Sequence, residues 1–166
     1  MALRNIFIEG EEILGQKAKE VGQVDEKIRQ LLDDMRETMQ AADGLGIAAP
    51  QVGILKRIFV IELDEQLIEM INPVIVSQEG SQIVEEGCLS VPGMVGTVER
   101  PAVIKMRGLD RQGKEFEIEG EDMLAVALSH EYDHLDGILY TEKAIDLHFV
   151  SDDDENNQSS QGVPLD

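Results

Sequence analysis

The segment Asp122–Leu135 (DMLAVALSHEYDHL) joins an apolar stretch to a pair of histidines, and it constrains the fold more than any other part of the chain. Its apolar residues predict a helix buried in the core: Met123, Leu124, Val126, Ala127 and Leu128. At about 100° per residue, His130 and His134 lie about 40° apart on one face, one turn from each other. Buried imidazoles need partners, so this pair predicts a bound metal ion with Glu131 beside it, able to take a proton from water.

The sequence offers one convincing third ligand for such an ion. Catalytic sites usually have three protein ligands and one open position. Downstream, His148 is expected to be a surface residue, and the longer HExxHxxGxxH pattern is absent because Tyr140 stands at its last position. Cys88 is the only cysteine; alone it would be interpreted as a small buried apolar residue, but beside two histidines a thiolate is a good ligand. Gly87 would let the backbone approach the ion, and a Cys–His–His set suits zinc or ferrous iron.

A glycine-rich segment, Asp43–Gly53 (DGLGIAAPQVG), superficially matches a dinucleotide-binding turn. That turn needs a preceding strand and a following helix, whereas here a helix is expected before it and Pro50 blocks a regular helix after it. The segment instead predicts a strained loop whose backbone approaches a ligand. Gln51 would offer an amide donor to a substrate oxygen, the alternative being an ordinary surface glutamine.

The remaining pattern predicts a single α+β domain over residues 1–150. Asp25–Ala41 has apolar residues at helical spacing, with Asp25 as N-cap, while Asp122 and Gly137 would cap the two ends of the C-terminal helix. Four segments predict strands: Arg57–Leu63, Met70–Val76 (broken by Asn72-Pro73), Ala102–Leu109 and Lys114–Ile118. Because strands and helices do not alternate regularly, mostly antiparallel sheets around the C-terminal helix are expected.

Charge and composition exclude several classes of function. The net charge of −20 argues against general electrostatic binding of nucleic acid or of an anionic membrane surface. No signal peptide or apolar run of membrane-spanning length is visible, so a cytoplasmic protein is expected. The last sixteen residues, 151–166, carry five acidic residues and little that is apolar, which predicts a disordered tail.

Three segments, taken together, resemble the peptide deformylase family. They are GLGIAAPQ (Gly44–Gln51), EGCLS (Glu86–Ser90) and HEYDH (His130–His134), in the same order and with similar spacing, and the resemblance covers roughly residues 3–147. It implies a metal-dependent hydrolase that removes the formyl group from the N-terminal formyl-methionine of nascent polypeptides. It also implies transient contact with the ribosome and a bacterial cytoplasmic location.

The resemblance implies a role for each matching residue. Cys88, His130 and His134 look like the ligands of one divalent ion, Fe²⁺ in the cell, with Zn²⁺, Ni²⁺ or Co²⁺ able to replace it. Glu131 looks like the general base and then the acid, with the Gln51 amide, the Leu89 N–H and the metal holding the oxyanion. The substrate-binding residues implied are Leu45 and Gly46 along the substrate backbone, Val126 and Ala127 around the methionine side chain, and Glu86, which is also expected to pair with Arg100.

The chain departs from the family pattern at three places. Ser129 stands where the family often has glutamine, Gly15 follows Leu14 where arginine is common, and the acidic end replaces the basic helix that some relatives use for ribosome contact. Two other functions remain open at this point. A small zinc peptidase would cleave internal peptide bonds, and a regulatory protein would keep the metal but not the catalysis.

Overall fold

The computed structural model describes residues 2–150, so the predicted acidic tail lies outside the described residues. The helices are α1 (Glu26–Ala41) and α2 (Asp122–Leu135), with short 3-10 turns η1 (Glu12–Gly15), η2 (Ala49–Val52) and η3 (Tyr140–Glu142). The strands are β1 (Gly46–Ala48), β2 (Ile58–Leu63), β3 (Gln66–Glu79), β4 (Gln82–Cys88), β5 (Val91–Arg100), β6 (Val103–Leu109), β7 (Glu115–Glu121) and β8 (Asp146–Phe149). They form two antiparallel sheets, with strand orders β1-β2-β3-β6-β7 and β4-β5-β8, which confirms the α+β prediction.

Strand β2 lies between the two helices, and this position explains why its residues are apolar at successive positions. Side chains alternate along a strand, so Ile58 and Val60 point to the cluster that contains α1. Phe59 and Ile61 point the other way, into the cluster that contains α2. All four are fully buried, because each face of β2 is covered by a helix.

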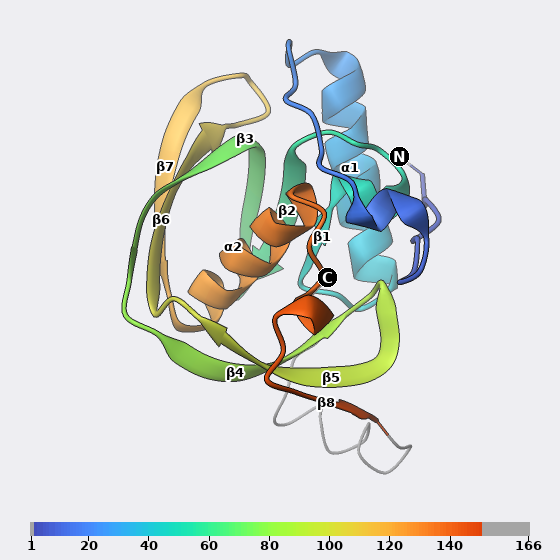
Figure 1. Ribbon diagram of the computed structural model, residues 1–166. Coiled ribbons are helices and arrows are strands. Elements are labelled where there is room, and N and C mark those ends of the chain that lie inside the picture. Colours follow the sequence, from blue (N-terminus) through green and yellow to red (C-terminus); the bar gives the residue numbers. More distant parts are fainter. Residues whose placement is uncertain (1, 151–166) are drawn as a thin grey trace.

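Helix α2 lies in the middle of the molecule, between the two sheets (Figure 1). The five-stranded sheet curves around one side of it, and the three-stranded sheet passes beneath it in this view. Gly137 takes a left-handed conformation (φ +74°) just beyond the helix, and its N–H donates to the His134 carbonyl, as the predicted C-terminal glycine should. His130 and His134, in the last two turns of α2, are buried, and His134 contacts Cys88 of the three-stranded sheet.

The start of α2 differs from the prediction that Asp122 caps it. Strand β7 runs directly into the helix, so Asp122 is the turning residue (φ +52°) and Glu121 occupies the N-cap position, with no side-chain cap bond. Aspartate tolerates this left-handed geometry better than most residues. In contrast, Asp25 caps α1 as expected, accepting the Ile28 N–H at 3.1 Å.

One strand prediction and one loop prediction need correction. Asn72 does not interrupt a strand but forms a bulge inside the longer β3, where its left-handed backbone (φ +53°) accompanies a shift in register against β6. Its side chain is held by two hydrogen bonds to the backbone of Val21. The predicted strained loop is also wrong for Gly46–Ala48, because these residues form β1 and pair with β2. Pro50 begins the short turn η2, and no regular helix follows, as expected.

Within residues 2–150, neither helix is both long and apolar enough to cross a membrane.

Candidate metal centre and active site

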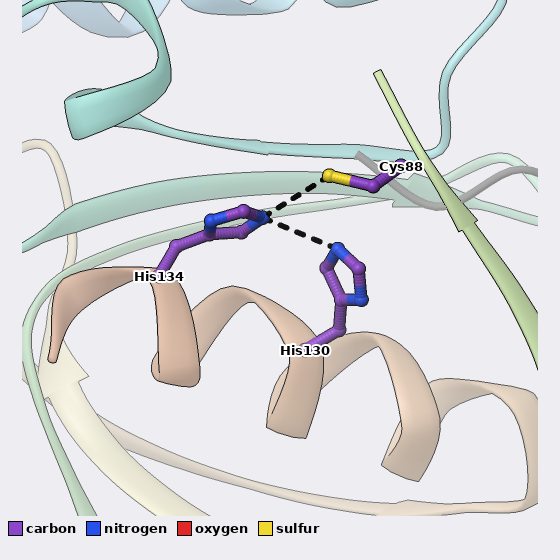
Figure 2. A group of neighbouring side chains, drawn as sticks. All are labelled: Cys88, His130 and His134. Atoms are coloured by element: carbon purple, nitrogen blue, oxygen red, sulfur yellow. Dashed lines mark hydrogen bonds between the residues drawn. The ribbon is translucent and has the colours of Figure 1, made fainter. Parts of the chain in front are cut away.

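Three buried side chains converge between α2 and the end of β4 (Figure 2). His130 and His134 come from successive turns of α2, and Cys88 comes from the last residue of β4, where a register shift against β5 bends the strand. The two Nε2 atoms lie 3.2 Å apart, and the Cys88 Sγ lies 3.5 Å from the His134 Nε2. The three residues predicted as ligands are therefore brought together, with all ligand atoms within 4.8 Å of one another.

This spacing fits a single divalent ion. A tetrahedral ion with bonds of about 2.0–2.1 Å to nitrogen and about 2.3 Å to sulfur separates two nitrogens by about 3.3 Å and a nitrogen from a sulfur by about 3.5 Å. The observed 3.2 and 3.5 Å match both values. Nitrogen and thiolate donors suit zinc or ferrous iron rather than magnesium or calcium, which prefer oxygen.

A buried ion-pair network orients the first histidine from behind. The His130 Nδ1 lies 2.7 Å from Glu86 Oε1, so the ring donates Nδ1–H to the carboxylate and keeps the Nε2 lone pair toward the other ligands. Arg100 binds both oxygens of Glu86, at 2.6 and 2.8 Å, and donates to Asp133 at 2.7 Å. Lys143 adds a second positive charge on Asp133, at 2.9 Å.

Glu86 is thus part of the support for the metal ligands. Burial by itself would raise the pKa of its carboxyl, but hydrogen bonds from Arg100 and His130 outweigh burial and lower the pKa from 4.5 to about 2. The group stays ionised at neutral pH and remains an acceptor for His130. Its side chain is fully buried and both oxygens are occupied, so the structure favours a positioning role over the substrate contact predicted from sequence.

Glu131 is fully buried and lies against Gly46 of β1. A Cβ atom on Gly46 would stand 2.6 Å from the Glu131 Oε2, closer than real Cβ contacts allow. The first residue of β1 must therefore be glycine for the carboxylate to occupy this position beside the two histidines. The glycine pattern that superficially matched a dinucleotide-binding turn is explained here by the close approach of a carboxylate to the backbone.

Gln51 and Leu89 lie next to Cys88, Gln51 in space and Leu89 in the chain. Gln51 is fully buried, not a surface glutamine, and its Nε2 lies 3.8 Å from the Cys88 Sγ. Leu89 directly follows Cys88, and its side chain packs on Gly44, where a Cβ would stand 2.8 Å from the leucine Cδ1. Both glycines of the GLG motif therefore make room for a residue predicted in the site.

The predicted pocket residues lie on α2 one turn before His130. Val126 and Ala127 are buried in the core cluster, against which Leu45 packs as a half-buried neighbour. All three side chains therefore belong to or border the apolar core cluster around α2. His148 is exposed on the edge strand β8, away from the three ligands, as expected.

Comparison with known proteins decides the family. The family model described as polypeptide deformylase matches residues 3–149. The chain belongs to the peptide deformylase family. A peptide deformylase of Acetivibrio thermocellus is 54% identical over 154 residues, which cover 93% of this chain and 89% of that protein. A peptide deformylase of Alkaliphilus metalliredigens is 56% identical over 145 residues, covering 87% and 99% of the two chains.

Solved peptide deformylases have the same fold. The crystal structure of the enzyme from Thermotoga maritima superimposes with a TM-score of 0.85 at 36% identity, covering 87% of this chain and 99% of that one. The enzyme from Synechococcus elongatus, solved in complex with actinonin, gives a TM-score of 0.83 at 37% identity, covering 85% and 80%.

Three residues near the deformylase site were not predicted from sequence. Asp133 and Ser90 lie inside the HEYDH and EGCLS motifs, so their place in the sequence next to the predicted ligands could have identified them as site residues. Tyr140 had none: it packs beside the His130 ring with 6.1 Å between ring centroids, and its hydroxyl donates to the Met94 carbonyl at 2.9 Å. Burial raises the pKa of this hydroxyl, so the Tyr140 side chain stays uncharged beside the His130 ring.

Proposed function

We propose that this protein is a peptide deformylase, which hydrolyses the formyl group of N-formyl-methionine at the start of nascent polypeptides. The observation that carries the proposal is the convergence of one thiol and two imidazoles, with all ligand atoms within 4.8 Å of one another and a buried carboxylate from the residue that follows His130. Membership of the peptide deformylase family supports the choice of a formyl amide as the substrate.

The ion is held by Cys88, His130 and His134 in this proposal, and when bound it lowers the pKa of water and polarises a carbonyl. Glu131 takes a proton from the attacking water, whose oxygen bonds to the formyl carbon. The same carboxyl then gives this proton to the departing nitrogen as the C–N bond breaks, which leaves formic acid and a free N-terminal amine. Formic acid loses its remaining proton to the solvent at neutral pH and becomes formate.

Two donors from the protein stabilise the charge that develops on the formyl oxygen. They are the side-chain amide of Gln51, which lies 3.8 Å from the Cys88 Sγ, and the backbone N–H of Leu89, the residue that directly follows Cys88. Preorganised donors of this kind act mainly in the transition state. Leu45 and Gly46 hold the peptide backbone, and Val126 and Ala127 line the pocket for the methionine side chain.

We also propose the finer biological assignments. Fe²⁺ is the ion in the cell, with Zn²⁺, Ni²⁺ and Co²⁺ as possible replacements, because all accept imidazole and thiolate donors. The protein works in the bacterial cytoplasm, where a reducing environment protects Cys88 from oxidation, and meets its substrates close to the ribosome.

A substrate comparison tests the proposal. Protein purified without oxygen, with its metal content measured, is given formyl-Met-Ala-Ser and, separately, casein. A deformylase releases formate from the first and leaves the second intact. Cleavage of casein without release of formate would replace this proposal with the zinc-peptidase alternative. If the protein released no formate and cleaved no casein, it would be interpreted as a metal-binding protein without catalytic activity.

A further inference from the structure

A fully buried serine joins the two segments that carry the proposed oxyanion donors. Ser90 follows Leu89 in the chain, and its Oγ accepts a hydrogen bond from the Gln51 Nε2 at 3.0 Å. We infer that Ser90 is a positioning residue, which fixes the Gln51 amide relative to the Leu89 N–H. This inference rests on the proposed function, because it assigns a role to Ser90 through the two donors of that reaction.

The orientation of the Gln51 amide follows from its other contact. The backbone N–H of Ala48 donates to the Gln51 Oε1 at 2.9 Å, so the oxygen must lie on the side of β1. The NH₂ group then faces the opposite way, toward Ser90 and the Cys88 Sγ. The Ser90 hydroxyl takes one of its two N–H groups, which sets the direction of the other toward the metal-ligand side.

The backbone of the same serine is fixed independently. The Ser90 carbonyl accepts the Glu9 N–H at 2.6 Å, and the Gln51 carbonyl accepts the Phe7 N–H at 2.8 Å. The N-terminal segment thus fixes the backbone of both donor-bearing segments through these two hydrogen bonds. The hydroxyl of Ser90 makes the shorter of two side-chain contacts between them, at 3.0 Å against 3.8 Å for the contact of Gln51 with the Cys88 Sγ. Its removal therefore changes the orientation of the Gln51 amide while leaving these backbone bonds intact.

The chain offers a matched control for this hydroxyl. Ser129 is also buried, precedes the ligand His130 directly, and its Oγ has no hydrogen-bond partner among the described residues. Ser129→Ala therefore removes the same atom at a similar depth without breaking a hydrogen bond. We expect it to leave kcat and KM for formyl-Met-Ala-Ser near their normal values.

Ser90→Ala is expected to lower kcat about tenfold, with KM within about twofold and metal content unchanged, since oxyanion donors act in the transition state. Gln51→Ala, which removes the donor, is expected to cost about 10²–10³-fold in kcat. In the Gln51→Ala background, Ser90→Ala should cost nothing further, because its effect passes through Gln51. Ser90→Thr, which keeps a hydroxyl, should recover most of the activity.

A spectroscopic measurement tests the same link without turnover. In zinc-loaded protein labelled with ¹⁵N-glutamine, the Gln51 side-chain amide is identified by its loss in Gln51→Ala. Ser90→Ala should shift this resonance and speed its hydrogen exchange, while Ser129→Ala should not. An equal loss of kcat for Ser90→Ala in both backgrounds, or an unmoved Gln51 resonance, would overturn the inference. If the unaltered protein released no formate, the proposed function would be wrong, and the resonance alone would decide whether Ser90 holds Gln51.

Discussion

Replacing Gly46 by alanine tests the placement of Glu131 without touching the carboxylate itself. The added Cβ would stand 2.6 Å from the Glu131 Oε2, whereas ordinary van der Waals contact begins at 3.4 Å. The carboxylate must therefore move by about 0.8 Å, since the other nearby atoms, at 3.1 and 3.3 Å, belong to the same side chain. A displacement of about 1 Å in a reacting group can cost about 10²-fold, or about 2.7 kcal/mol in the activation barrier.

The fold should tolerate this change. Gly46 lies in β1 without a left-handed backbone, so alanine fits its conformation, and alanine in a strand is favoured over glycine by about 0.5–1 kcal/mol. The three metal ligands are untouched. We expect kcat/KM for formate release from formyl-Met-Ala-Ser to fall about 10²-fold, while metal content and melting temperature stay close to those of the unaltered protein.

Gly22→Ala is the matched control, because a Cβ at Gly22 meets nothing within 4 Å. Gly44→Ala is a graded comparison, since its Cβ meets the flexible end of the Leu89 side chain and a smaller loss is expected. Normal turnover by Gly46→Ala would show that the position of the Glu131 carboxylate does not matter to the reaction. Loss of the metal from this variant would show that the contact supports the ligands instead.

Three further predictions concern the ligands and their support. Glu131→Ala should retain the metal but lose about 10²–10⁴-fold in kcat, because the proton-transfer group is gone. Formate release and metal content, measured on the same sample, check this, and a fully active variant would exclude Glu131 as the general base. Cys88→Ser should lose its ion on dialysis, and metal content equal to that of the unaltered protein would exclude Cys88 as a ligand. Arg100→Met should lower the free energy of unfolding in urea by about 3–5 kcal/mol, because Glu86 and Asp133 keep buried charges without their shared partner. Arg107→Met, which removes an exposed cation paired with Glu117, should leave the free energy of unfolding nearly unchanged, and equal losses would contradict the burial argument.

The parts of this fold that the sequence predicted are those with local causes. Helix α2 was predicted with its observed bounds, because its apolar residues and the glycine that follows it all lie in one short continuous segment of the chain. The shared face of His130 and His134 follows from helix geometry alone. Strand β2 was found for a similar reason, since its run of β-branched and aromatic residues is continuous.

The parts that were missed depend on contacts distant in sequence. Strand β1 has only three residues, too few for a period, and exists because β2 pairs with it. Asp133 meets Arg100 through packing of α2 on β5, across 33 positions of the chain. The contact of Glu86 with His130 was not predicted, although its pairing with Arg100 was, because sequence cannot tell which way a strand residue faces when a register shift follows it, as it does before Cys88.

The division of the ligands between two elements has a consequence for stability. Cys88 belongs to the three-stranded sheet, while both histidines belong to α2, so a bound ion adds a cross-link between two parts that packing, the Arg100 network and the hydrogen bond from Gln82 to the Asp122 carbonyl also hold together. By linkage, an ion at 100 times its dissociation constant adds about 2.7 kcal/mol to the folded state. This free energy opposes local opening between β4 and α2 in particular, so occupancy by the ion and closure of this part of the molecule depend on each other.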